Sequence, residues 1–225
     1  MPIVIRRKTA TAIAFVFGVI AVLLIGLTVV RFAERQIRED FERSERIRSQ
    51  QWLAEQKESL LSGDASGVHF YSTRGTDKLL AELAGIPEIE GLYFELTDLT
   101  DEGVATLAEL PNLKSLTLYG GNPRVGDVGL ATLSRSRSLE KLRLVNTDVT
   151  DDGLAALQHF PRLRDLTIAC DVGRLSEKAM HSLAALEHLE KLKVSGHWIS
   201  KAGLAELKRA LPNCDVVEKT NWRDP

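Results

Sequence analysis

From Ile86 to the C-terminus, apolar residues recur in groups of three with the spacing L-x-x-L-x-L, where L is a large apolar residue and x is any residue. The spacing returns every 24 to 26 residues, at Ile89-Leu92-Phe94, Leu113-Leu116-Leu118, Leu139-Leu142-Leu144, Leu163-Leu166-Ile168 and Leu189-Leu192-Val194. A period of this length predicts a short strand and a returning helix in each unit. Because one unit cannot bury its apolar side alone, we expect the units to stack into a solenoid with one continuous core.

The same interval extends the pattern towards both ends of the chain. Shifting back by 24 residues places Val68 and Phe70 on Leu92 and Phe94, so "GVHFY" is predicted to be the first strand. Near the C-terminus, "LPNCDVV" matches "LPNLKSL", and Val217 is predicted to close the core ladder. The pattern therefore predicts an α/β fold with about seven parallel strands and six helices.

The predicted helices start with similar residues. Thr100-Asp101-Glu102-Gly103, Thr150-Asp151-Asp152-Gly153 and Ser200-Lys201-Ala202-Gly203 each precede an apolar pair. Thr or Ser is expected to accept a hydrogen bond from the first turn as an N-cap, and the acids lie at the positive end of the helix dipole. The adjacent carboxylates Asp151 and Asp152 would also suit a metal or acid–base site, but their recurrence at helix starts favours capping.

The segment "LTDEGVATLAELPNLKSLTL" resembles the leucine-rich repeats of bacterial proteins, especially planctomycete ones, and of the cysteine-containing subfamily found in F-box proteins. The resemblance covers residues 68 to 217 and implies a leucine-rich-repeat solenoid, or horseshoe, that binds macromolecules. It implies no particular ligand, and without an F-box before the repeats it implies no ubiquitin-ligase role. The chain departs from the strict asparagine-ladder form of the repeat, because that position holds Thr73, Thr97, Pro123, Thr147, Gly173 and His197.

An uncharged run of 22 residues, Thr9 to Val30, precedes the repeats. It is long enough to cross a bilayer core, so an N-terminal transmembrane helix is predicted. A cleaved signal peptide fits less well, because the run is longer than a usual apolar core and no small-residue cleavage site follows it. Arg6, Arg7 and Lys8 favour an inside N-terminus, a single-pass cell-membrane protein and an extracytoplasmic repeat domain, although arginines also follow the run.

Residues 31–61 are rich in Glu, Arg, Gln and Ser and predict a charged helical stalk. Glu34–Arg38, Glu39–Arg43 and Glu42–Arg46 have the i,i+4 spacing of helical ion pairs. The apolar residues of the stalk do not hold a heptad, so a coiled coil is weakly supported. The predicted organisation is a tail at 1–8, the transmembrane helix at 9–30, the stalk at 31–61, the repeat domain at 62–219 and a C-terminal tail at 220–225.

Composition adds little to this picture. The net charge of −2 gives no support for a nucleic-acid partner. The two cysteines, Cys170 and Cys214, lie two repeats apart, roughly 10 Å at the strand spacing, so they are expected to be free thiols. Sequence motifs for metalloproteases, serine hydrolases, phosphate loops and dithiol redox sites are absent. We therefore expect no enzymatic activity, no metal site and no cofactor.

Strand residues that alternate with the core leucines are expected to face the concave surface of the solenoid. All three tyrosines, Tyr71, Tyr93 and Tyr119, take such positions on successive strands, and Arg143 is beside them. A cluster of Tyr and Arg on a rigid sheet is typical of a protein-binding hot spot, although Tyr also simply suits a half-exposed strand. Lys193 and other basic residues extend the face, but interleaved acids favour a mixed-charge protein partner over a polyanion.

Two units are longer by two residues, and each addition places an arginine, Arg124 or Arg174, before its helix. These loops are either tolerated length variants or a second contact at the rim. The sequence as a whole predicts a membrane-anchored module that binds a protein through its concave face. The alternative is a structural or assembly subunit whose stalk and anchor oligomerise while the repeats pack against a complex.

Overall fold

The computed structural model describes residues 7–119, 124–170 and 173–218, with side chains from residue 26 onward. The chain divides into two compact units, Met1–Trp52 and Leu53–Pro225. Helix α1 runs without interruption from Arg7 to Ser62 and therefore contributes to both units. The helical conformation predicted for the stalk is present.

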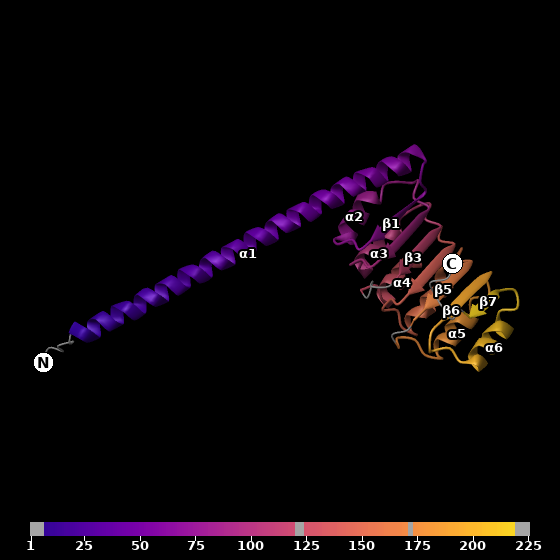
Figure 1. Cartoon of the computed structure of the whole chain (residues 1–225). Helices are drawn as coiled ribbons and strands as arrows, with labels where there is room; N and C mark the ends of the chain where they lie inside the picture. Colours follow the sequence, from indigo (N-terminus) through magenta and orange to yellow (C-terminus); the bar gives the residue numbers. More distant parts are fainter. Residues whose placement is uncertain (1–6, 120–123, 171–172, 219–225) are drawn as a thin grey trace. The chain divides into compact units, whose positions relative to one another are not determined.

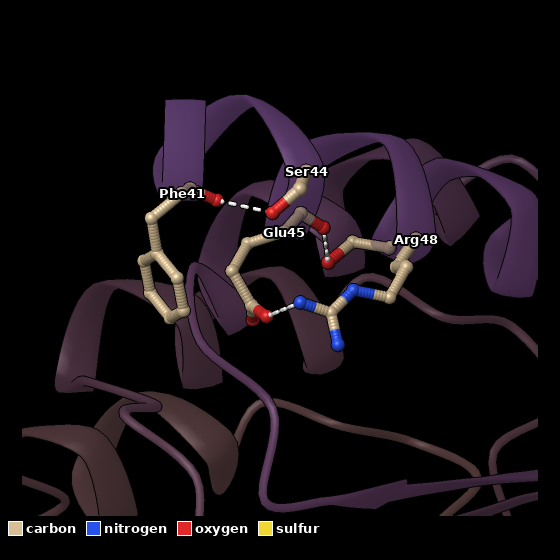
Figure 2. A network of polar contacts seen from close by, with 5 residues as sticks. Phe41, Ser44, Glu45 and Arg48 are labelled. Atoms are coloured by element: carbon tan, nitrogen blue, oxygen red, sulfur yellow. Dashed lines mark hydrogen bonds and ion pairs between the residues drawn. The ribbon is translucent and has the colours of Figure 1, made fainter. Parts of the chain in front are cut away.

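The first unit consists mainly of α1. Its described ion pairs are Arg35–Glu39 at 2.8 Å and Glu45–Arg48, in place of the three predicted pairs. Figure 2 shows Arg48 beside Glu45, and the Ser44 hydroxyl donates to the Phe41 carbonyl one turn away at 2.8 Å. These exposed pairs contribute little stability, about 0.3–0.5 kcal/mol each. Four large apolar side chains of this unit, Phe32, Ile37, Phe41 and Ile47, are exposed.

Among the described residues there is no helix both long and apolar enough to cross a membrane. The predicted transmembrane segment, residues 9–30, is helical in its backbone, but its side chains up to residue 25 lie outside the described residues.

The second unit is built on one parallel sheet whose seven strands follow the order of the chain, as predicted. Figure 1 shows the strands side by side with the helices along one face. The strands are β1 (Gly67–Tyr71), β2 (Gly91–Glu95), β3 (Ser115–Tyr119), β4 (Lys141–Val145), β5 (Asp165–Ala169), β6 (Lys191–Ser195) and β7 (Asp215–Glu218). The returning segments are α2 (Thr76–Leu83), α3 (Asp101–Leu107), α4 (Asp127–Leu133), η1 (Gly153–His159), α5 (Ala179–Ala184) and α6 (Lys201–Ala210). Six helical segments were predicted, and the fourth, η1, is a 3₁₀ helix.

The strand register confirms the repeat assignment from β1 to β6. Leu92, Leu116 and Leu142 are successive register partners, and all three are buried. Phe70 and Phe94 stack at 4.8 Å between ring centroids in the same core. The prediction was wrong at β7, where Val216 pairs with Leu192 and is buried. Val217 lies half-buried in the adjacent row, because a shift of one residue moves a strand side chain to the other face.

Aspartates at the helix starts connect each unit to the next. The Thr100 backbone N–H and hydroxyl donate to Asp77, at 3.0 and 2.6 Å. The Thr150 N–H and hydroxyl donate to Asp127 in the same way, both at 2.7 Å. We call this series the aspartate ladder; its carboxylates are Asp77, Asp101, Asp127 and Asp151. The predicted N-caps are present at Thr100 and Ser200, which accept from their own first turns. The N-cap predicted at Thr150 is absent, since η1 starts after Asp152 and has no side-chain cap. The ladder acids bind the following unit.

The glycine in the third helical position leaves room for this carboxylate. A β-carbon on Gly103 would lie 2.1 Å from Asp77 Oδ1 and 2.7 Å from Leu99 Cδ1. The equivalent glycine of α6, Gly203, faces Ser200 and Met180 at 3.3 Å or more, because no ladder carboxylate reaches it. The repeated Asp-x-Gly motif therefore records a contact between neighbouring units.

The last turns of α1 close the N-terminal end of the core. Leu53 and Leu60, seven residues apart on one face of the helix, are buried, whereas Leu61 is 67% exposed. Leu60 therefore covers the first repeat, whereas its neighbour Leu61 does not. Lys57 Nζ lies 3.8 Å from the Glu82 carboxylate of α2 and adds a polar contact to this end.

Both cysteines are free thiols. Cys170 is buried, and burial raises the pKa of the Cys214 thiol to about 11. Deprotonation of Cys214 is thereby suppressed near neutral pH, so this thiol is a poor nucleophile.

Candidate functional site on the concave face

The face of the sheet opposite the helices (the concave face) consists of residues that alternate with the buried leucines. Register pairing places them in three rows. The first row is Gly67, Gly91, Ser115, Lys141, Asp165 and Lys191; the second is His69, Tyr93, Thr117, Arg143, Thr167 and Lys193; the third is Tyr71, Glu95, Tyr119, Val145, Ala169 and Ser195. These rows agree with the sequence prediction.

The predicted tyrosines come together at the N-terminal end of this face. Tyr93 and Tyr119 stack with ring centroids 5.9 Å apart, on β2 and β3. His69 of β1 meets Tyr93 edge-on at 4.3 Å and Tyr71 at 6.2 Å. We call His69, Tyr71, Tyr93 and Tyr119 the aromatic cluster. Tyr71 is 60% exposed and the other two tyrosines are half-buried, so the cluster presents ring surface to solvent.

Glu95 supplies the negative charge next to these rings. Its carboxylate lies 3.8 Å from His69 Nε2. Burial, followed by the charge of Glu95, raises the pKa of the Tyr93 phenol, which also bonds to that carboxylate. Glu95 is therefore held by groups of its own face, and Tyr93 remains a neutral hydrogen-bonding phenol near neutral pH.

Arg143 occupies the middle of the second row, two strands from Tyr93. Its side chain is half-exposed, but its Nε–H is buried and has no hydrogen-bond partner within the described structure. The residues beside it in the row, Thr117 and Thr167, are each 7% exposed. An unpaired buried donor costs about 1–3 kcal/mol. The rest of the half-exposed guanidinium is accessible to an acceptor from outside.

Basic residues continue the face towards the C-terminus. Lys141 and Lys191 flank Asp165 in the first row, and Lys193 follows in the second row. Beyond Tyr119, the residues of the third row were expected to be exposed on the concave face, but they are not. Val145 and Ala169 are buried there, and so contribute no contact surface.

The two rim arginines differ in their surroundings. Arg174 forms an ion pair with Asp148 of the preceding unit at 2.7 Å, so its charge already stabilises the loop. Arg124 is exposed beside residues 120–123, which lie outside the described residues. The structure therefore does not bring either arginine into the aromatic cluster.

Sequence reasoning missed two residues of the site. His69 was placed in its row but not recognised as a member of the aromatic cluster, although its position one strand before Tyr93 was a usable signal. Leu96 follows Glu95, is 52% exposed and has φ 53°. The residue directly after the strand also has positive φ at Ser72, Asn146 and Gly196. Because Gly and Asn favour that conformation, Asn146 and Gly196 at this place in the repeat were a usable signal.

A polar groove of about 570 Å³ lies at the beginning of β4 to β6. Residues preceding the strands alternate in sign here and nearby, and Lys114 contacts Glu90 at 2.7 Å while Arg164 lies 3.8 Å from Glu190. The residues that line the groove are all charged and include no aromatic ring, so the groove is a weaker candidate for a protein contact than the aromatic cluster. In the described part of the chain, no group of His, Cys, Asp or Glu is placed to hold a metal ion.

The family described as Leucine Rich repeat matches residues 135–157 and 185–208. The first match covers the unit of β4 and η1, and the second covers the unit of β6 and α6, so the unit of β5 and α5 lies between them. All three units belong to a sheet whose seven parallel strands follow the chain order. The chain therefore contains segments that match leucine-rich repeats, and its parallel sheet is consistent with a leucine-rich-repeat solenoid. A comparison with curated proteins gave no match. Leucine-rich repeats are generally associated with protein–protein interaction.

Proposed function

We propose that this protein is a leucine-rich-repeat binding module that captures a protein partner on its concave face and has no catalytic activity of its own. The aromatic cluster carries the proposal. Four rings gather on a rigid sheet, and tyrosines of this kind supply large contact areas at low entropic cost. Arg143 with its unpaired Nε–H, and Lys193, extend the contact surface.

We expect the triple variant Tyr71→Ala, Tyr93→Ala, Tyr119→Ala to fold but to lose its partner. An exposed strand Tyr→Ala costs the fold only about 1 kcal/mol or less, whereas a hot-spot tyrosine contributes about 2 kcal/mol or more to binding. Circular dichroism checks folding. Affinity is measured for the partner that the wild-type chain captures and mass spectrometry identifies.

The matched control replaces three exposed residues of the helical face, Glu102, Val128 and Gln158, with alanine. This variant should retain the partner. Undiminished affinity in a folded tyrosine variant would exclude the concave face and turn attention to Arg124 and Arg174, or to the stalk.

We further propose that residues 9–30 anchor the module in the cell membrane, with the repeats on the extracytoplasmic side. The support is the uncharged run of 22 residues and the basic residues before it. Removing residues 1–30 should release a folded repeat domain, because the core is complete from Leu53 onward. Retention of this variant in the membrane pellet, or an unfolded circular dichroism spectrum, would contradict the proposal. Proximity labelling from the C-terminus in intact cells reports the side of the membrane.

The competing candidate is an assembly subunit that oligomerises through α1. It is favoured by one observation, the exposure of Phe32, Ile37, Phe41 and Ile47. In that case, replacing these four residues with serine should change the oligomeric state measured by light scattering. The tyrosine variant should not.

A further inference from the structure

We infer that the partner segment recognised by the concave face is acidic, with one apolar ring seated on the aromatic cluster and a carboxylate seated on Arg143. This inference rests on the proposed binding function and specifies its ligand. It starts from the charges of the face that are already paired and those that are not.

The acid of the aromatic end is already occupied. Glu95 contacts His69 and bonds to Tyr93, so its carboxylate has little capacity for a cation brought by a partner. At Arg143 the situation is reversed. Its buried Nε–H lacks an acceptor, and its register neighbours Thr117 and Thr167 do not supply one. The exposed end of this guanidinium can donate to a carboxylate, and planar N–H groups of arginine bind carboxylates in a bidentate manner.

The charged residues near Arg143 also favour a negatively charged ligand. From β4 to β7 the first two rows hold the bases Lys141, Arg143, Lys191 and Lys193 and the acids Asp165 and Asp215. Both acids lie in the first row, whereas the charges of the second row, which contains Arg143, are basic from β4 to β7. The second row is therefore positive in this half of the face, and it adjoins the rings at Tyr119, which is one strand from Arg143. Complementarity favours a partner with acidic residues next to an apolar ring and disfavours a basic one.

The strand spacing sets the pattern of the partner segment. Tyr93 and Arg143 lie in one row two strands apart, and Lys193 lies two strands beyond Arg143. Strands of a sheet are about 4.8 Å apart, so each step is roughly 10 Å. In a polyproline II segment, residues three apart lie on one side and span about 9 Å. In an α-helix, residues seven apart span about 10.5 Å. A ring followed by an acid at one of these spacings fits the face.

A peptide-display selection tests the inference. Random twelve-residue peptides on phage are selected against the immobilised full-length chain in mild detergent, and the selected sequences are resynthesised. We expect an aromatic or large apolar residue followed by Asp or Glu after three or seven positions. Replacing that acid by its amide should weaken binding to the wild-type chain about tenfold or more, as expected for a charge-assisted pair.

In the Arg143→Gln variant, the affinity of the acidic peptide should exceed that of its amide form by about twofold or less, because the partner of the acid is gone. Arg135→Gln, which removes an exposed charge outside the strands, is the matched control and should leave the ratio of these two affinities unchanged. If Arg143→Gln does not fold, Arg143→Lys retains the charge without the Nε–H and should reduce the ratio partially.

The outcomes separate the two proposals. The acidic-ligand inference is overturned if the selected peptides need the three tyrosines but carry basic residues, or if they bind equally well as amides. In both cases the proposed binding face is retained. Peptides that bind the tyrosine triple variant as well as the wild type, or a selection that enriches none, contradict the binding face itself.

Discussion

Leu142→Ala is expected to lower the free energy of unfolding by about 2–5 kcal/mol, the range found for buried leucines that leave a cavity. Leu142 is 0% exposed at the centre of β4, between Leu116 and Leu166 in the core row. In a repeat array the cavity weakens the interfaces with both neighbouring units. Urea denaturation measures the loss.

Lys141→Ala is the control for that experiment, since Lys141 precedes Leu142 on the same strand and is exposed. It should change stability by no more than about 0.5 kcal/mol. A loss below about 1 kcal/mol for Leu142→Ala would mean that Leu142 does not fill the core row.

Gly103→Ala is expected to destabilise the repeat domain by about 2–4 kcal/mol, because its methyl group displaces the Asp77 carboxylate and Leu99. The hydrogen bonds that Asp77 accepts from Thr100 would be lost with it. Urea denaturation again gives the magnitude, and Asp77→Ala should produce a loss of similar size.

Gly203→Ala is a matched substitution at the third residue of α6, where no ladder carboxylate is present. It should be neutral or stabilising by up to about 1 kcal/mol, because alanine is the better helix former. Equal effects at the two positions would show that the carboxylate contact is not what requires glycine.

The repeat pattern was sufficient to predict the sheet, because side-chain alternation and a fixed period determine which residues are buried. The error at Val217 arose where the "LPN" match and the strand register differ by one residue. Pairing with Leu192 decides between them, and such pairing is a three-dimensional property. The rows of the concave face followed from the same alternation, so Tyr71, Tyr93 and Tyr119 were placed correctly.

Side-chain partners were harder to predict than rows. The sequence gives no sign that Arg174 pairs with Asp148, since that contact depends on how a loop folds back across one unit. The aspartates were assigned to their own helices, because capping is a local interaction that can be read from adjacent residues. Their actual partners are 23 to 25 residues away, a distance that only the stacking of the units makes short.

The aspartate ladder also determines where this protein can be cut and rejoined. An acid of one unit accepts a hydrogen bond from the Thr, Ser or, at Asp101, Gly126 of the next unit. At Asp77, Asp101 and Asp127 the glycine of that next helix also contacts the acid, and we call each such contact a joint. A duplication, deletion or fusion preserves these joints only if it removes or adds whole periods. The unit containing α5 differs, since Asp151 reaches Ser176 while Ala179 takes the place of the glycine and Glu177 that of the aspartate. Its Ser176 can therefore donate to the acid of the preceding unit, but it lacks the aspartate that would accept from the next unit. This unit is suited to the C-terminal side of any shortened or lengthened array.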